Sequence, residues 1–414
     1  MDLYLSKPGV MSCAGNNIDE LWNAVITGKQ DNIKKVKACN DEEYFAARIP
    51  DDILKPSGAR YDMKIMRIEN AALEQIEDDV KAVVSKYGAD RIAVCIGSCD
   101  NGTEFSLANH RKYFADGVFP KDYNIEIQGA DYVSTFVAEK FGLTGPANTF
   151  ATACSSSAGA IIKAAEMIKA GLVDAAIVGG IDIASDTTLI GFSALEAVSS
   201  EITNPFSKNR HGITLGDGAA FFVLTREPIS TLRLRSGTET VKLLGWGESA
   251  DAYHMTSPDP SGAGAEKAIR RALENAGLAT SDVGYINLHG TGTKFNDSME
   301  AKAVAAIFGG DGEATGQTAQ VPVSTTKPVT GHTLGAAAAL EAAICWKALV
   351  ENQGKNDNIK IPLQVWDGER DEELPALNIV DGKSGADGES GELKVCLSNS
   401  FAFGGANACL VLGV

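Results

Sequence analysis

Short apolar runs alternate with longer helical runs along this chain, and no other feature restricts its fold as much. Residues 91–96 and 175–178 have the composition of buried strands, and the run of small residues at 155–170 has that of a helix. Gly171 follows that run, and glycine is common just past a helix end. Because strands joined by helices lie in sheets with the helices on their faces, the sequence predicts an α/β fold rich in parallel strands.

The alternation continues to the C-terminus and divides into two similar halves. The other expected strands are 148–153, 219–224, 241–245, 284–288, 321–324, 394–398 and 409–412, and the other expected helices are 264–276, 298–307 and 336–349. Each half then has strand, helix, strand and a closing antiparallel pair. The polar segment 226–239 separates them, so we expect one unit at 1–230 and a second at 231–414. Residues 381–392, rich in Gly, Ser, Asp and Glu, predict an exposed loop.

Charge and cysteine usage exclude several classes of function. The net charge of −17 argues against binding to nucleic acid or to an anionic membrane surface. No apolar run reaches transmembrane length, and the N-terminus lacks the pattern of a signal peptide. Cys95 and Cys99 are four apart, but no second pair or nearby histidine completes a metal site. We therefore expect a cytoplasmic protein in a reducing compartment, with no metal.

Cys154 stands where an extended run changes into a helical one. Small residues follow it, so a helix can begin there close to the sheet. The free N–H groups and positive field of a helix start favour a thiolate, and the same N–H groups could form part of an oxyanion hole. A buried structural cysteine is the alternative for a cysteine taken alone.

Two histidines, far apart in the sequence, each lie beside glycine. His289 ends an apolar run and precedes Gly-Thr-Gly-Thr, whose hydroxyls on Thr291 and Thr293 face one side of the turn. His332 opens a helix of very small residues. A thiol with two imidazoles suits carbon–carbon bond formation through an acyl-thioester enzyme, whereas each histidine alone could be a satisfied loop residue.

Charged residues and a glycine-hinged loop surround these candidates. Lys327 precedes His332 by five residues, and either Glu300 or Glu341 could pair with it. In the segment 398–407, Gly404 and Gly405 permit unusual backbone angles, and Phe403 could act as a gate at a hydrophobic pocket. The alternatives are solvated surface charges and an ordinary hairpin turn with a packed aromatic ring.

Together these segments resemble the β-ketoacyl-acyl-carrier-protein synthases, condensing enzymes of the thiolase superfamily, over nearly the whole chain. Four blocks occur in the order of that family, at 152–157, 289–293, 327–332 and 401–405. The resemblance implies a thiolase fold, in which two similar halves form a five-layered α-β-α-β-α core.

The resemblance also implies a role for each matching residue. Cys154 would be the acyl-accepting nucleophile, and His289 and His332 would promote malonyl decarboxylation and stabilise the enolate. Further active-site residues would be Lys327 and Glu300, with Asp297 and Glu341 structural. Backbone N–H groups of Cys154 and Phe403 would form the oxyanion hole, and Gly404, Asp251 and His254 would belong to two gating loops that move together. Thr291 and Thr293 would contact the phosphopantetheine arm, and Phe192 and Phe401 the acyl substrate.

The resemblance implies a ping-pong reaction without a metal or redox cofactor, because the phosphopantetheine arm of acyl carrier protein delivers the substrate. Lys64 and Arg67 lie where the family places part of its docking surface, with Lys208 and Arg210 as weaker candidates. The family forms dimers, which predicts a homodimer here. A heterodimer with a chain-length-factor-like subunit is the alternative.

Two details differ from the usual pattern of fatty-acid condensing enzymes, namely the serines at 155–157 and Ala402 in the 401–405 block. Together with the segments 191–198 and 204–210, they are most similar to the stand-alone ketosynthases of aryl-polyene pathways. The alternative functions are a chain-length-factor-like subunit, which lacks the nucleophile, and another acyltransferase of the thiolase superfamily. Biosynthetic thiolases have a second catalytic cysteine, and initiating synthases an asparagine, where this chain has His332, so the resemblance favours an elongating enzyme.

Overall fold

The computed structural model describes residues 1–121, 123–232, 240–309, 319–355, 358–382 and 392–414. Much of the two polar segments expected at 226–239 and 381–392 therefore lies outside the described residues.

A twelve-stranded sheet runs through the molecule. Its path is β13-β12-β11-β14-β15-β10-β1-β9-β7-β5-β6, and β2 pairs with β9. The strands are β1 (Tyr4–Leu5), β2 (Gly9–Ser12), β5 (Ile92–Gly97), β6 (Ala147–Phe150), β7 (Ala175–Asp182), β9 (Gly218–Thr225), β10 (Val241–Ala250), β11 (Tyr285–Asn287), β12 (Ala319–Ser324), β13 (Leu377–Ile379), β14 (Val395–Phe401) and β15 (Ala406–Gly413). A separate small sheet contains β3 (Lys34–Lys37), β4 (Glu43–Ala47) and β8 (Leu215–Gly216).

The two halves of the large sheet repeat one strand order. The first half runs β6-β5-β7-β9-β2 and the second β12-β11-β14-β15-β10. In both, the first three strands are parallel and the last two pairings are antiparallel. The similarity expected from the sequence is thus a repeat of topology, and β1 joins the halves by pairing with β9 and β10.

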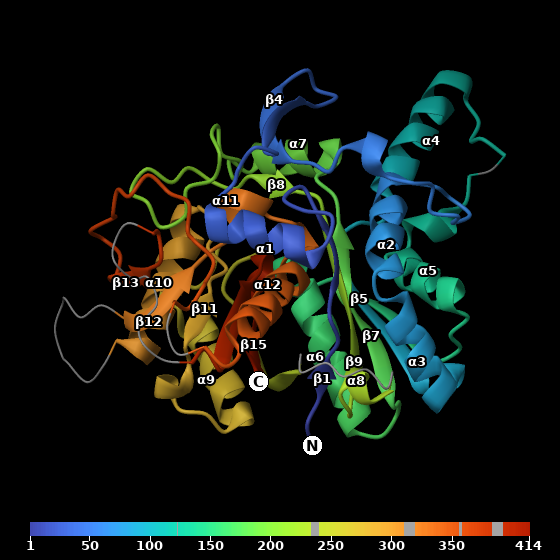
Figure 1. The fold of residues 1–414 in the computed structure, drawn as a ribbon. Helices are drawn as coiled ribbons and strands as arrows, with labels where there is room; N and C mark the ends of the chain where they lie inside the picture. The colour runs from blue at the N-terminus through green and yellow to red at the C-terminus, as the bar shows by residue number, and fades with distance from the viewer. Residues whose placement is uncertain (122, 233–239, 310–318, 356–357, 383–391) are drawn as a thin grey trace.

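Two helices of small residues lie between the halves. These are α6 (Ser156–Lys169) and α12 (Ala337–Asn352), and each connects equivalent strands of its half. They contact each other, α6 packs on β5 and β7, and α12 packs on β9 and β14 (Figure 1). Nearly every residue of α12 is buried, as expected for a helix that is apolar all round.

The other helices cover the outer faces and the ends of the sheet. They are α1 (Ile18–Thr27), α2 (Lys64–Glu74), α3 (Glu77–Tyr87), α4 (Thr103–Asp116), α5 (Tyr132–Phe141), α7 (Asp186–Ala194), α8 (Ile229–Leu232), α9 (Ala263–Ala276), α10 (Lys294–Phe308) and α11 (Lys327–Thr330). Helices α2, α3 and α5 pack on the first half, and α9 and α10 on the second (Figure 1). The layers confirm the predicted α-β-α-β-α fold. Among the described residues, no helix combines the length and the apolar character needed to cross a membrane.

Candidate active site

A tight turn between β6 and α6 carries Cys154. The strand ends at Phe150, earlier than predicted, because a 3₁₀ turn over Ala153–Ser155 precedes the helix. Ala153 has φ +50°, a left-handed conformation that is uncommon for a residue with a side chain. The turn is held by the Ser156 hydroxyl, which accepts a bond of 2.9 Å from the N–H of Thr152. Cys154 is consequently buried, with 7% of its surface exposed.

The environment of Cys154 differs from the sequence expectation of a readily formed thiolate. Burial raises the pKa of Cys154 to about 11. The nearby Lys327 and the backbone N–H groups of Phe403 and Cys154 oppose this effect and lower the pKa. The prediction from the helix start was therefore incomplete, because it omitted the desolvation of a thiol enclosed by the second half.

Cys154, His289 and His332 meet in the interior. The Cys154 sulfur and one ring nitrogen of each histidine all lie within 4.8 Å of one another. The two imidazole rings are 5.4 Å apart between centroids and perpendicular. His289 follows β11, whereas His332 lies between α11 and the 3₁₀ turn Leu334–Ala336, so it does not itself open α12 as expected.

Both histidines present an N–H to the centre of this cluster. Burial and the nearby Lys327 hold the pKa of each imidazole well below its usual value, so both are neutral. Nδ1 of His332 accepts a bond of 3.0 Å from the N–H of Leu334, which leaves its proton on Nε2. Nδ1 of His289 faces the ammonium of Lys327 at 3.5 Å, and its Nε2 is buried without a partner among the described residues. Two Nε2–H groups can therefore donate to one oxygen.

Lys327 pairs with Glu341 rather than with Glu300. Its ammonium donates to the Glu341 carboxylate and to the carbonyl oxygen of His289. Burial raises the pKa of Glu341 to about 7, and Lys327 opposes that effect. Lys327 thus connects α12 to the loop that carries His289.

Glu300, on α10, shapes the backbone of the same loop. Its carboxylate accepts bonds of 2.8 Å from the N–H groups of both His289 and Gly290, and one of 3.2 Å from Asn399. Burial raises its pKa to about 7, while these donors lower it. The described contacts of Glu300 are with this loop and Asn399, so it acts on His289 through the backbone.

The two threonines after His289 lie as the sequence predicts. Their hydroxyls are 3.0 Å apart, and Thr293 is partly exposed. Asp297 supports the turn by accepting from the N–H of Gly292 at 3.1 Å. Gly292 has φ +80°, and a Cβ there would lie 2.2 Å from the Thr203 hydroxyl, so the turn requires glycine.

The two predicted gating loops are bonded to each other. The N–H of Gly404 donates to the carbonyl of Met255 at 2.7 Å, and the N–H of Asp251 to that of Gly405 at 2.9 Å. The Asp251 carboxylate also accepts from Asn407 at 2.6 Å. The structure therefore places the loops together.

The aromatic candidates and His254 have different surroundings. The rings of Phe403 and Phe192 are 5.7 Å apart between centroids, and both are partly buried. Phe401 is buried, and its ring lies 6.2 Å from that of His289, so it packs behind the imidazole. His254 is exposed and contacts Thr256, away from the cluster of Cys154.

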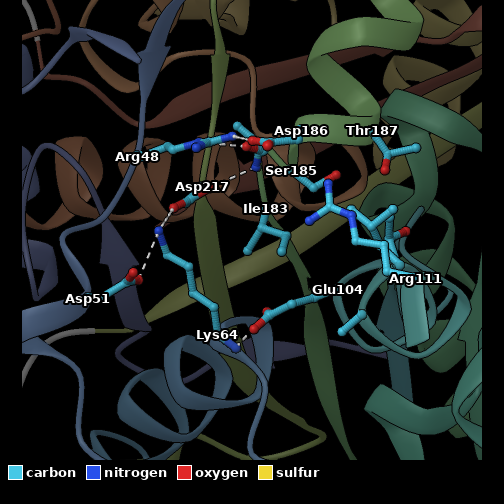
Figure 2. A pocket seen from close by; sticks show the side chains of 14 residues that line it. Arg48, Asp51, Lys64, Glu104, Arg111, Ile183, Ser185, Asp186, Thr187 and Asp217 are labelled. Carbon is cyan, nitrogen blue, oxygen red and sulfur yellow. Dashed lines mark hydrogen bonds and ion pairs between the residues drawn. The ribbon is translucent and has the colours of Figure 1, made fainter. Parts of the chain in front are cut away.

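The basic residues predicted to dock a partner are largely engaged within the chain. Lys64 extends into a cavity of about 340 Å³, where its ammonium lies 2.9 Å from the buried carboxylate of Asp217 and 3.3 Å from that of Asp51 (Figure 2). Arg67 pairs with Asp62 at 2.9 Å and remains about one-third exposed.

Of the two weaker docking candidates, Lys208 is exposed and pairs with Glu369 at 2.5 Å. Arg210 is only 5% exposed and donates to the carbonyl oxygen of Ser207 at 2.8 Å, so it is a buried structural residue.

Sequence reasoning missed one buried carboxylate close to the site. Asp182 ends β7, four residues beyond the predicted end of that strand, and burial raises its pKa to about 7. It accepts from the N–H of Cys99 and from the N–H of Gly335. The sequence did contain a sign of this residue, because Asp182 directly follows an apolar run. A carboxylate buried in such a place is rare unless hydrogen-bond donors or cations surround it.

Comparisons with known proteins agree over the whole chain. Residues 9–228 match the N-terminal domain of β-ketoacyl synthases, and residues 241–355 match their C-terminal domain. A 3-oxoacyl-[acyl-carrier-protein] synthase 2 of Coxiella burnetii is 32% identical, covering 98% of this chain and 96% of that protein.

Solved structures agree as well. A ketosynthase in complex with its chain length factor from Xenorhabdus doucetiae is 35% identical, with a TM-score of 0.81 over 100% of this chain and 98% of that one. The ishigamide ketosynthase/chain length factor is 25% identical, with a TM-score of 0.84 over 100% and 99%.

Proposed function

The chain belongs to the β-ketoacyl synthase family, and we propose that it joins an acyl group held on Cys154 to a malonyl group on acyl carrier protein. The reaction is a decarboxylative Claisen condensation, and its product is a 3-oxoacyl carrier protein. The observation that carries this proposal is the convergence of the Cys154 sulfur with a ring nitrogen of His289 and of His332 within 4.8 Å.

The first half-reaction transfers the acyl group. The Cys154 sulfur attacks the thioester carbonyl, the carrier thiol leaves, and the proton from Cys154 passes to that thiol. The N–H groups of Cys154 and Phe403, which already lower the pKa of the thiol, are suited to receive the oxyanion. Splitting the condensation through a covalent intermediate replaces one difficult step by two easier ones.

The second half-reaction forms the new carbon–carbon bond. A malonyl thioester placed between the rings would accept hydrogen bonds on its carbonyl oxygen from Nε2–H of His289 and of His332. As carbon dioxide leaves, that oxygen gains charge as an enolate, and the two donors stabilise it most at this stage. The enolate carbon attacks the acyl carbonyl, and the Cys154 thiolate leaves and takes a proton from solvent, which replaces the one lost to the carrier thiol.

We propose that the phosphopantetheine arm of the carrier protein passes along Thr291 and Thr293. Their paired hydroxyls lie on the loop that carries His289, and Thr293 is partly exposed. The steps above use only a thiol, imidazoles and N–H groups, so we propose that no metal or redox cofactor takes part. A cytoplasmic location would suit such a reaction with a soluble carrier.

Carrier-protein docking is proposed at Arg67 rather than at Lys64. Reversing the charge of Lys64 would leave the buried Asp217 carboxylate without its cation, so that variant would test folding. Arg67→Glu should raise the KM for carrier protein, and Lys81→Glu, at an exposed ion pair on α3, is the matched control. An unchanged KM in Arg67→Glu would remove this docking site.

We propose that the chain dimerises through β6. This strand is at the end of the large sheet, its residues are exposed or half-buried, and an uncovered edge is a pairing surface. A homodimer is the simpler assembly. The solved relative bound to its chain length factor supports the heterodimer alternative. A monomer mass by light scattering for the chain alone and for a mixture with such a subunit would refute both.

Acyl transfer is tested by intact-protein mass spectrometry after incubation with a panel of acyl carrier proteins. Native protein should gain the mass of the acyl group, and Cys154→Ala should not, whereas Cys39→Ala, at an exposed cysteine, should still gain it. The preferred acyl group would separate saturated fatty-acid substrates from the polyene substrates that the 401–405 block resembles. No adduct from any donor would contradict an autonomous condensing enzyme and favour a chain-length-factor-like role.

A further inference from the structure

The carboxylate of Asp182 links the turns on either side of the candidate active site. Asp182 is 1% exposed and ends β7. Its Oδ2 accepts from the N–H of Gly335 at 2.6 Å and from the N–H of Cys99 at 2.9 Å. Its Oδ1 accepts from the Ser98 hydroxyl at 2.9 Å and from the N–H of Asp100 at 3.0 Å. One side chain therefore ties the end of the first-half sheet to the second half.

On the histidine side, Asp182 holds the turn that orients His332. Gly335 lies in this turn, and the N–H of the preceding residue, Leu334, donates to Nδ1 of His332 at 3.0 Å. Leu334 has φ +52°, which costs energy for a residue with a side chain and persists only where neighbouring contacts maintain it. A Cβ at position 335 would lie 2.6 Å from the Asp182 oxygen, so the turn and the carboxylate are in direct contact.

On the nucleophile side, Asp182 acts through Cys99. Its bond to the N–H of Cys99 places that thiol 3.4 Å from the carbonyl oxygen of Ala153, to which it can donate. Ala153 directly precedes Cys154 and has φ +50°. Ala153, beside Cys154, and Leu334, near His332, both have left-handed backbones, and each is linked to the Asp182 carboxylate through one neighbouring residue.

We propose that Asp182 is a positioning residue that sets the geometry between Cys154 and Nε2 of His332. The role rests on the proposed condensing function, because the distance between Cys154 and His332 matters only if both groups act in the same reaction. Asp182 touches neither reacting group. Because a misplacement of about 1 Å can cost about 100-fold in rate, losing this link should impair the chemical step more than substrate binding.

An amide cannot replace this carboxylate. All four donors that face it supply hydrogens, so Asp182→Asn would set its NH₂ group against at least one N–H or O–H group. Gly335→Ala keeps the carboxylate but inserts a methyl group into the contact between Asp182 and the turn. The two variants therefore disturb the same link from opposite sides.

The test measures decarboxylation of malonyl carrier protein by the full chain. We expect Asp182→Asn and Gly335→Ala to lower kcat by about 10- to 100-fold, with KM within about twofold of native protein. Glu69→Met is the control, because it removes a different buried carboxylate that lies outside the contacts of Asp182. It should keep kcat within about twofold.

Circular dichroism establishes that each variant is folded. A folded Asp182→Asn with native kcat would overturn the proposal, as would an equal loss of kcat in Glu69→Met. If Asp182→Asn does not fold, Gly335→Ala decides the question by the same criterion. A native chain with neither acyl adduct nor decarboxylation would refute the condensing function, whereas an active native chain with unaffected variants would refute only the positioning role.

Discussion

The ammonium of Lys327 lies 3.5 Å from Nδ1 of His289, and both side chains are buried. The same ammonium donates to the carboxylate of Glu341, which has no other cation within salt-bridge distance among the described residues. This pair therefore connects the stability of the second half to the orientation of an imidazole that the condensation uses.

Breaking that pair on one side should destabilise the protein. Glu341→Gln leaves the Lys327 ammonium buried without a counter-charge, so we expect the free energy of unfolding to fall by about 3–5 kcal/mol. Replacing both residues by methionine should recover most of that loss without restoring condensation, since His289 then lacks its Nδ1 partner. Urea unfolding measures the first effect. Additive losses in the double variant would show that the two side chains do not interact.

Removing either imidazole should impair decarboxylation more than acyl transfer. His289→Ala and His332→Ala each delete one donor to the enolate oxygen, so we expect about a 100- to 1,000-fold fall in the kcat for malonyl decarboxylation. In the proposed mechanism, backbone N–H groups receive the acyl oxyanion instead. Acylation of Cys154, followed by rapid-quench mass spectrometry, should fall much less. Equal losses in both half-reactions would contradict this division of roles.

The reactivity of Cys154 in the free protein should rise steeply with pH. Its pKa is raised to about 11, so below that pH the thiolate fraction increases about tenfold per pH unit. Alkylation of Cys154 by iodoacetamide, followed on its peptide by mass spectrometry, should accelerate in that proportion from pH 7 to 9. Lys327→Met should be slower at each pH, because the lysine lowers the pKa of the thiol. A rate that levels off below pH 8 would show a much more acidic thiol.

A buried glutamate outside the site should make stability depend on pH. Glu69 on α2 is fully buried, and neither carboxylate oxygen has a hydrogen-bond partner within the part of the chain that the structure describes. Burial raises its pKa well above 4.5. The favourable contribution of neutral Glu69 to the free energy of unfolding is fully present below about pH 4.5. It is lost as the pH rises through the pKa of Glu69 in the folded protein.

Glu69→Met should therefore be more stable than native protein at pH 8, and the difference should shrink toward pH 5. Thermal unfolding across this range measures it. A difference that grows as the pH falls would contradict the burial argument. Tyr4→Phe, at a partly exposed side chain near the N-terminus, should show no such pH-dependent difference from native protein.

The two gating loops should respond as one unit. Asp251→Ala and Asn407→Ala each remove the 2.6 Å bond from the Asn407 amide, on β15, to the Asp251 carboxylate, on the gating loop that contains Asp251 and His254. We expect each to raise the KM for malonyl carrier protein and to lower kcat by several-fold, because both loops frame the site around Phe403. The double variant should resemble either single variant. Multiplicative effects on kcat/KM would instead mean that the loops act independently.

The sequence was most informative where the chemistry is local. The loop from His289 to Thr293 contains its own turn residues, so the pairing of its threonines followed from spacing alone. The meeting of Cys154 with His332 depends instead on the packing of α6 against α12, so the sequence suggested it only through the chemistry that a thiol and two imidazoles share and through the resemblance to a known family. The pairing of Lys327 with Glu341 rather than Glu300 was left open, because both carboxylates are on helices beside the site.

Interactions between distant elements account for the surroundings that the sequence could not predict. Lys64 has the sequence context of a surface lysine, yet it turns toward Asp217, which is distant in the chain and close only in the fold. The raised pKa of Cys154 reflects enclosure by the second half, which the sequence around the cysteine does not contain. Asp182 was missed because the expected strand stopped at residue 178, before the carboxylate that ends it.

The repeated strand order has a stoichiometric consequence. The turns Ala153–Ser155 and Leu334–Ala336 follow corresponding strands and precede corresponding helices, so Cys154 and Gly335 occupy equivalent middle positions. Only the first of these positions carries a thiol, and at the second a Cβ on residue 335 would lie 2.6 Å from the Asp182 oxygen, too close for a side chain unless the neighbours shift. Of the two equivalent positions in one chain, one can thereby hold a covalent acyl group, so a homodimer would hold two and a heterodimer with a subunit that lacks the cysteine would hold one.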